Sequence, residues 1–142
     1  MRILILCTGN SCRSQMAQGW MQSFDARLDV HSAGTEPAKQ VNPGAVKVMY
    51  EAGIDISRHA PKSVGIYRDM EWDYVITVCD EANESCPVFT GKVRNRLHMG
   101  FEDPSKVSGP DDFVRSEFIR VREDMRTKLF ALYESEIKGK IQ

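Results

Sequence analysis

Apolar and polar positions along the chain form blocks that predict strands and helices in turn. Residues 2–6 contain a short apolar run after Arg2, with no alternation of polar and apolar positions, which is typical of a strand buried on both faces. Further strands are predicted at 28–32, 73–79 and 93–98. Apolar residues that recur every three or four positions predict amphipathic helices that begin at Ser14, at Pro43 and after Gly109-Pro110. A further short helix is expected within 60–70.

This alternation predicts an α/β fold, a three-layer sandwich with a four-stranded parallel sheet and helices on both faces. Right-handed crossovers between parallel strands place the helices on the two sides of the sheet. Ligands of such sheets bind at the carboxyl ends of the strands. Cys7 and Cys79 both fall at predicted strand carboxyl ends, so we expect these two thiols at one functional edge.

The composition predicts a single globular domain over residues 1–142. Apolar residues make up 42% and charged residues 27%, which argues against disorder, and the chain is long enough to fold without a disulfide or metal. The net charge of −1 offers no basic field for nucleic acid or an anionic membrane. The longest apolar run, Ile3 to Cys7, is too short for a membrane span or a signal peptide. We therefore expect a cytoplasmic protein, and a monomer.

The four cysteines, Cys7, Cys12, Cys79 and Cys86, need an explanation in a compartment that keeps thiols reduced. Their spacings, C-x4-C and C-x6-C, do not match a structural zinc knuckle, and the three histidines lie far from them in sequence. No metal site is predicted. Each thiol is either an inert core side chain or part of the chemistry.

The segment from Cys7 to Ser14 follows a predicted strand and opens a predicted helix, which is the geometry of an anion cradle. Backbone N–H groups converge there, and the helix N-terminus adds partial positive charge. Asn10 tolerates a left-handed conformation, and Arg13 can hold a tetrahedral oxyanion with two parallel donors. The same field lowers the expected pKa of Cys7, and Ser14 can donate a hydrogen bond to the thiolate. The residues expected to bind the oxyanion are Thr8, Gly9, Asn10, Ser11, Cys12, Arg13 and Ser14. The alternative is an ordinary strand-to-helix turn with a buried cysteine.

This loop resembles the phosphate-binding loop of the low-molecular-weight protein tyrosine phosphatases. The segments 32–35 and 55–57 and the pair Asp103-Pro104 also resemble that superfamily, so the likeness covers nearly the whole chain. Within the superfamily, Cys79 and Cys86 resemble the redox pair of the thioredoxin-coupled arsenate reductases, which the phosphatases lack. The resemblance implies reduction of arsenate to arsenite for arsenic detoxification, with thioredoxin as partner and no bound cofactor.

The resemblance also implies a role for each catalytic residue. Cys7 is the nucleophile, Arg13 binds the oxyanion, and Asp103 is the general acid. Cys79 then attacks the Cys7–arsenic adduct, and Cys86 resolves the resulting disulfide, which thioredoxin reduces. Cys12 has no part in this relay and is interpreted as structural. Some relatives bind a monovalent cation through an acidic side chain where this chain has Gln18, so no potassium requirement is predicted.

The number of residues between Cys79 and Cys86 limits the conformations in which these two cysteines can form a disulfide. If 80–85 is helical when reduced, the two residues lie ~10.5 Å apart along the axis, at ~1.5 Å per residue. A disulfide needs Cα atoms roughly 4.4–6.8 Å apart, so the segment has to unwind on oxidation.

Two rival functions remain at this point. The first is a phosphatase that hydrolyses phosphate monoesters with Cys7, Arg13 and Asp103 alone, although Ser105 and Lys106 stand where phosphatases of this family typically carry aromatic residues. The second is a non-catalytic zinc or redox-sensing module.

Overall fold

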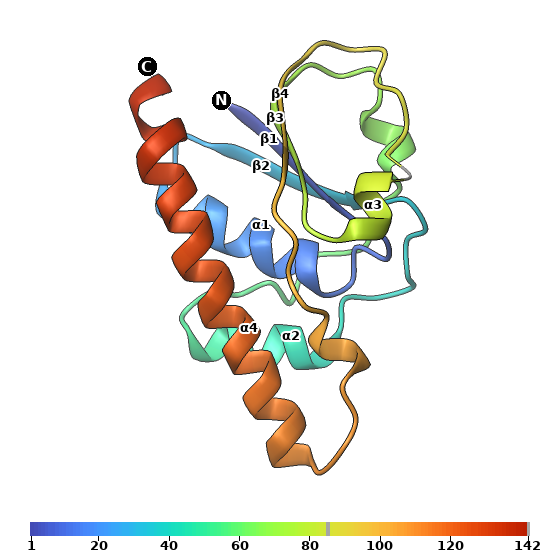
Figure 1. Ribbon diagram of the computed structural model, residues 1–142, viewed down its shortest axis with the longest axis vertical. Helices are drawn as coiled ribbons and strands as arrows, with labels where there is room; N and C mark the ends of the chain where they lie inside the picture. Colours follow the sequence, from blue (N-terminus) through green and yellow to red (C-terminus); the bar gives the residue numbers. More distant parts are fainter. Residues whose placement is uncertain (85, 142) are drawn as a thin grey trace.

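A four-stranded parallel sheet lies at the centre of the protein (Figure 1). The computed structural model describes residues 1–84 and 86–141. The strand order is β2-β1-β3-β4, and all three neighbouring pairs are parallel. The strands are β1 (Arg2–Cys7), β2 (Asp29–Gly34), β3 (Trp72–Thr77) and β4 (Val93–His98). The predicted α/β fold with a four-stranded parallel sheet is therefore confirmed.

Helices follow the strands in alternation. They are α1 (Arg13–Phe24), α2 (Pro43–Glu51), α3 (Asp80–Glu84) and α4 (Asp111–Leu132). Single turns of 3-10 helix occur at Val64–Tyr67 and Pro104–Lys106, and a π turn extends α4. Among the described residues, no helix is long and apolar enough to cross a membrane.

Both faces of the sheet are covered. The side chains of residues 3–6 in β1 alternate between the two faces, and all of them have 0% exposure. On one face, the Ser32 hydroxyl donates to Gln18 of α1 at 2.5 Å. On the other, the ring of Tyr67 packs against His31 of β2, with centroids 5.4 Å apart. Figure 1 shows α4 beside α1 and α2, and these three helices contact one another on the α1 side of the sheet.

Two predicted elements differ from the structure. The predicted strand 73–79 ends at Thr77, because the chain turns after Val78 donates its amide to Leu6 and then enters α3. The helix expected within 60–70 is only the 3-10 turn at Val64–Tyr67, since Ser63 caps a single turn. In both cases the regular element is shorter than predicted. The strand ends early at the carboxyl edge of the sheet, and the helix is reduced to one turn on the face of the sheet.

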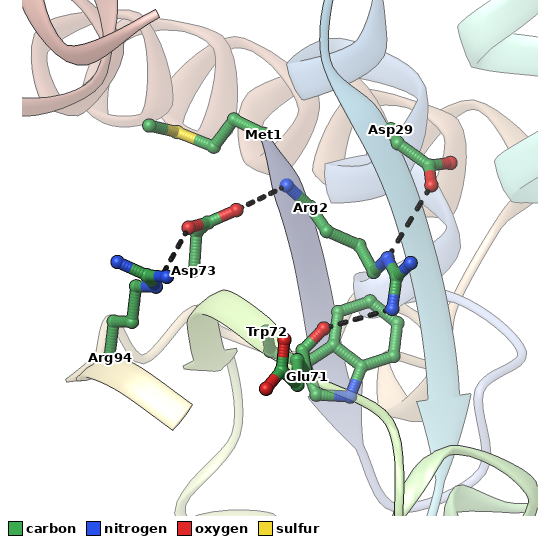
Figure 2. A pocket seen from close by; sticks show the side chains of 7 residues that line it. All are labelled: Met1, Arg2, Asp29, Glu71, Trp72, Asp73 and Arg94. Atoms are coloured by element: carbon green, nitrogen blue, oxygen red, sulfur yellow. Dashed lines mark hydrogen bonds and ion pairs between the residues drawn. The ribbon is translucent and has the colours of Figure 1, made fainter. Parts of the chain in front are cut away.

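Charged residues gather at the opposite, amino edge of the sheet, around a cavity of about 360 Å³ (Figure 2). The Asp73 carboxylate accepts from the Arg2 amide at 2.8 Å and pairs with Arg94 at 3.5 Å. The Arg2 guanidinium donates to the Glu71 carbonyl at 3.0 Å and lies 3.8 Å from Asp29. These contacts join all four strands at their beginnings, so we interpret the cluster as structural.

Candidate active site

The loop between β1 and α1 has the conformation of an anion cradle. Cys7 is the last residue of β1, and α1 begins at Arg13. Asn10 has φ 49°, the left-handed conformation expected from its residue type. Gly34 of β2 packs so closely that a Cβ there would lie 2.5 Å from the Thr8 carbonyl oxygen. A glycine is therefore required at this position for the loop to lie against the sheet.

Asn10 holds the loop from within. Its side-chain amide donates to Ser14 at 2.7 Å and to Ser32 at 2.9 Å. Its carbonyl oxygen accepts from the Lys62 amide at 2.9 Å and from Gln15 at 3.2 Å. Asn10 is fully buried, so these four bonds fix the loop without any ligand. Asn10 and Ser14 thus support the cradle from behind, and their side chains do not line the cavity that it encloses.

Cys7 is poised as a thiolate. Its pKa falls to about 5 because the Cys79 thiol donates a hydrogen bond to it, which outweighs the effect of burial. The Ser14 hydroxyl and the backbone amides of Ser14 and Asn10 contribute in the same direction. The expected lowering of the Cys7 pKa is confirmed, but its largest cause is the hydrogen bond from Cys79 rather than the helix N-terminus or Arg13.

Cys79 is the neutral partner of this pair. It is almost completely buried two residues beyond the end of β3, and its sulfur lies 3.5 Å from the Thr8 hydroxyl. The hydrogen bond to Cys7, together with burial, raises the pKa of the Cys79 thiol. The two sulfurs therefore share one negative charge and one proton at neutral pH, and the predicted meeting of these thiols at one edge of the sheet is confirmed.

Arg13 and Asp103 face each other across the mouth of the loop. The Arg13 guanidinium donates to the Phe101 carbonyl at 3.1 Å and pairs with the Asp103 carboxylate at 3.4 Å. The amide and hydroxyl of Ser105 donate to the other carboxylate oxygen, at 3.0 and 2.6 Å. Hydrogen bonds to one another and to neighbouring groups thus hold the side chains of Arg13 and Asp103 at the entrance of the loop.

These groups enclose a cavity of about 260 Å³, large enough for a tetrahedral oxyanion. Five of its lining residues come from the loop, in addition to Cys7: Thr8, Gly9, Ser11, Cys12 and Arg13. Asp103 completes the set that the sequence predicts. Glu81, Ser105 and Lys106 also line the cavity. Ser105 and Lys106 are the residues that replace the aromatic residues of the phosphatases, whereas the sequence gives no signal for Glu81 beyond its position shortly after Cys79.

Comparison with known proteins places the chain in a family. Residues 2–142 match the family described as low molecular weight phosphotyrosine protein phosphatase. The chain belongs to this family. Within it, the chain groups with the arsenate reductases: it is 46% identical to "Arsenate reductase" of Halalkalibacterium halodurans, over 91% of this chain and 94% of the relative.

Solved structures of the low molecular weight phosphatase family agree with this placement. A structure described as "An arsenate reductase in the phosphate binding state" superposes with a TM-score of 0.80 at 28% identity, covering 99% of this chain and 98% of that one. The thioredoxin-dependent arsenate reductase of Corynebacterium glutamicum has a TM-score of 0.70 at 26% identity, covering 97% of this chain and 62% of that one. The fold of the family is thereby shown for this chain.

Cys12 differs from the other cysteines of this family member. Its thiol points to the Met16 sulfur at 3.9 Å, and it is almost fully buried although it lines the cavity. Burial and the nearby Asp103 carboxylate raise the pKa of Cys12 to about 12. Cys12 therefore stays protonated at neutral pH, which agrees with its interpretation as a structural residue.

Cys86 lies outside the oxyanion cavity. It is half-buried at a second cavity of about 300 Å³ on the β3–β4 part of the sheet, and burial raises the pKa of its thiol. Helix α3 connects it to Cys79 and covers residues 80–84. The predicted helical segment is thus confirmed up to Glu84, and Ser85 lies outside the described residues.

Within residues 1–84 and 86–141, no group of three or more His, Cys, Asp or Glu side chains is placed to hold a metal ion. Gln18, the residue compared above with the acidic cation ligand of some relatives, accepts from Ser32 at 2.5 Å and donates to the Val30 carbonyl at 3.3 Å. Both ends of this amide are engaged by the protein, and the absence of a potassium requirement stays a prediction.

Proposed function

We propose that this protein reduces arsenate to arsenite through a relay of Cys7, Cys79 and Cys86, and that thioredoxin regenerates it. The observation that carries the proposal is the hydrogen-bonded pair of Cys7 and Cys79 at the oxyanion cavity. A hydrolase needs one nucleophilic thiol there, whereas a two-electron reduction needs two that can join. The similarity to arsenate reductases, one of them described as thioredoxin-dependent, supports the same conclusion.

The first step uses the charged groups at the loop. Backbone N–H groups of the cradle and the Arg13 guanidinium bind arsenate, and the Cys7 thiolate attacks the arsenic atom. Asp103 gives a proton to the departing oxygen, which leaves as water. The product is a covalent bond between the Cys7 sulfur and arsenic(V).

The second step follows from what the first does to the shared charge. Once the Cys7 sulfur is bonded to arsenic, it no longer carries the negative charge that raises the pKa of Cys79. Cys79 then loses its proton more easily, and the Thr8 hydroxyl and the Ala82 amide, which both lower its pKa, stabilise the new thiolate. Cys79 attacks the Cys7 sulfur, the sulfur–arsenic bond breaks with its electron pair on arsenic, and arsenite leaves.

The third step moves the disulfide away from the cavity. The Cys86 thiolate attacks Cys79, a Cys79–Cys86 disulfide forms, and Cys7 is released as a thiolate. At ~1.5 Å per residue, helical geometry between Cys79 and Cys86 corresponds to ~10.5 Å, which is too far for a disulfide, so this step requires α3 to unwind. Thioredoxin reduces the exposed disulfide by the same exchange chemistry, and no bound cofactor is needed.

Hydrolysis of phosphate monoesters is the second candidate function. Cys7, Arg13 and Asp103 form the set that a cysteine-dependent phosphatase requires, and phosphate and arsenate have the same charge and similar size. Ser105 and Lys106 line the cavity where an aromatic substrate ring would otherwise find an aromatic wall. We therefore expect phosphatase activity only as a residual property of the same cradle.

A coupled assay with arsenate, thioredoxin, thioredoxin reductase and NADPH tests the proposal. Cys79→Ser is expected to abolish repeated arsenate turnover but to preserve hydrolysis of a small aryl phosphate, because a serine hydroxyl can still donate to Cys7. Hydrolysis by the same variant controls for folding and for the state of Cys7. Arsenate turnover that survives this substitution would remove Cys79 from the relay.

A further inference from the structure

Cys86 occupies an environment that favours its neutral form. Its thiol points to the Pro87 carbonyl oxygen at 3.7 Å, and partial burial disfavours negative charge on the sulfur. In the relay proposed above, however, this sulfur has to attack as a thiolate. A group that stabilises negative charge on Cys86 is therefore required, and the second cavity contains one.

Arg96 of β4 meets this requirement. It lines the same cavity of about 300 Å³ as Cys86, and its charge and a hydrogen bond from its guanidinium act to lower the pKa of the Cys86 thiol. The guanidinium also lies over the ring of Phe89, 5.4 Å from the ring centroid. Phe89 is buried and belongs to the same connection as Cys86, so the cation is held beside this connection from the rigid strand β4.

The cavity that Cys86 and Arg96 share lies on the side of the sheet towards Cys79, the residue that Cys86 has to attack. Val75 and Thr77 of β3 line it, and Cys79 follows two residues after Thr77. Arg96 is the register partner of Val75 on the neighbouring strand. The guanidinium is thus fixed next to the strand that leads to the thiol that Cys86 must reach.

We propose that Arg96 is a positioning residue for Cys86, which it holds at the β3–β4 face and whose negative charge it stabilises during the attack on Cys79. This inference rests on the proposed relay. In the exchange step, Cys86 first loses its proton to solvent, its sulfur then bonds to the Cys79 sulfur, and the Cys7–Cys79 bond breaks with its electron pair on Cys7. Cys86 is oxidised and Cys7 is reduced, and no further reductant is involved.

Other charged groups border this region. His98 of β4 lines the cavity and pairs with Asp80 of α3 at 2.9 Å, and Arg68 donates to the Val88 carbonyl at 3.3 Å. Among the described residues, Arg96 is the side chain whose charge and hydrogen bond lower the pKa of Cys86. Because His98, Asp80 and Arg68 are unchanged in every variant below, differences between variants report on Arg96.

The test measures how fast iodoacetamide alkylates Cys86 in the fully reduced protein, by peptide mass spectrometry between about pH 7 and pH 9. Cys86 is the most exposed of the four cysteines, so limited reagent reaches it without unfolding. Loss of a neighbouring positive charge raises the pKa of a thiol, so Arg96→Gln is expected to lower the neutral-pH rate about three- to tenfold. Arg96→Lys is expected to restore most of the rate.

Arg94→Gln is the matched control, because it removes the same charge two residues earlier on β4, where Arg94 pairs with Asp73 at 3.5 Å. Its alkylation rate is expected to equal that of the unaltered protein. Equal rates for Arg96→Gln and Arg94→Gln would overturn the proposal. Alkylation needs no arsenate, so this result is independent of whether the relay operates.

A second measurement follows the formation of the Cys79–Cys86 disulfide after a single turnover of arsenate without thioredoxin. Arg96→Gln is expected to slow this step by the same factor as alkylation, while release of the first arsenite proceeds at its usual rate. A uniform slowing of both steps would contradict a role specific to Cys86. Absence of arsenite release in the unaltered protein would instead refute the proposed function and leave the alkylation result standing.

Discussion

The two edges of the sheet differ in how their charged groups are arranged. At the amino edge, oppositely charged side chains pair across neighbouring strands, Arg2 with Asp29 and Asp73 with Arg94 (Figure 2). At the carboxyl edge, hydrogen-bond donors from Cys79, Ser14 and the loop backbone converge on the single sulfur of Cys7. Paired surface charges contribute little beyond local stability. Donors directed at one buried atom change its protonation state, and this difference distinguishes the reactive edge from the structural one.

Between these two edges, cavity size alone would select the wrong one. The amino-edge cavity of about 360 Å³ is larger than the oxyanion cavity of about 260 Å³. Its lining residues include no cysteine, and four of its charged side chains form the ion pairs Arg2–Asp29 and Asp73–Arg94. The smaller cavity contains a thiolate, a guanidinium and a carboxylate around one space. The following predictions test this contrast, from the largest expected effect to the smallest.

Removal of the carboxyl group at the mouth of the cavity is expected to have the largest effect. Asp103→Asn deprives the leaving oxygen of its proton donor, so kcat for arsenate reduction and for aryl phosphate hydrolysis should fall about hundredfold or more. Steady-state kinetics of both reactions measure this. Glu102→Gln, which removes the adjacent exposed carboxylate, is the control and should leave both rates unchanged. Equal losses in the two variants would exclude Asp103 as the acid.

Loss of the amide that supports the loop is expected to affect stability. Asn10→Ala leaves the Lys62 amide and the buried serine hydroxyls without their hydrogen-bond partner. It also places at φ 49° an alanine, which has no side-chain hydrogen bonds to offset the unfavourable left-handed conformation. The free energy of unfolding in urea should fall by about 2–4 kcal/mol. A change below about 0.5 kcal/mol would mean that the loop does not depend on this hub.

The charge shared by the two sulfurs predicts a pH dependence. Cys7 loses its proton as the pH rises through about 5, so ultraviolet thiolate absorbance should appear there, and the nucleophilic rate should fall below that pH. Cys79→Ala removes the donor that contributes most to this lowering, so the midpoint should rise by about one pH unit, a tenfold change. Cys79→Ser keeps a donor and should shift the midpoint less. An unchanged midpoint in Cys79→Ala would contradict the pairing.

Neutralisation of a charge at the amino edge is expected to have the smallest effect. Asp73→Asn weakens the contacts with the Arg2 amide and with Arg94, and partly exposed pairs of this kind contribute about 1 kcal/mol or less. Thermal unfolding at low and high salt measures this loss, which should shrink as salt screens the charges. Arsenate and phosphatase rates should stay unchanged. A large loss of activity would show that the two edges are coupled.

Sequence reasoning succeeds at this site where the information is local. A strand, a turn with Asn10 and a helix that begins near Arg13 are adjacent in the chain, so their geometry follows from residue types and hydrogen-bond rules. The meeting of Cys7 and Cys79 also follows, because parallel strands bring their carboxyl ends to one edge.

The remaining features depend on packing between distant segments. Glu81 and Lys106 reach the oxyanion cavity only because α3 and the turn after Asp103 fold back over the loop. Cys79 is the main cause of the lowered Cys7 pKa because the two thiols form a hydrogen bond. The spacing of the two cysteines in the sequence does not predict this contact. The neighbourhood of Arg96 and Cys86 is likewise a product of how the 86–92 connection lies on β4.

The close approach of Gly34 to Thr8 has a consequence for engineering the binding cavity. Where Gly34 meets Thr8, backbone lies against backbone, so this part of the cradle offers no side chain that can be trimmed or enlarged to admit another anion. The opposite rim is better suited to a redesign of selectivity, because Glu81, Ser105 and Lys106 present side chains of adjustable size and charge there. Directed evolution towards bulkier oxyanions should accumulate its substitutions at those three positions and leave position 34 untouched.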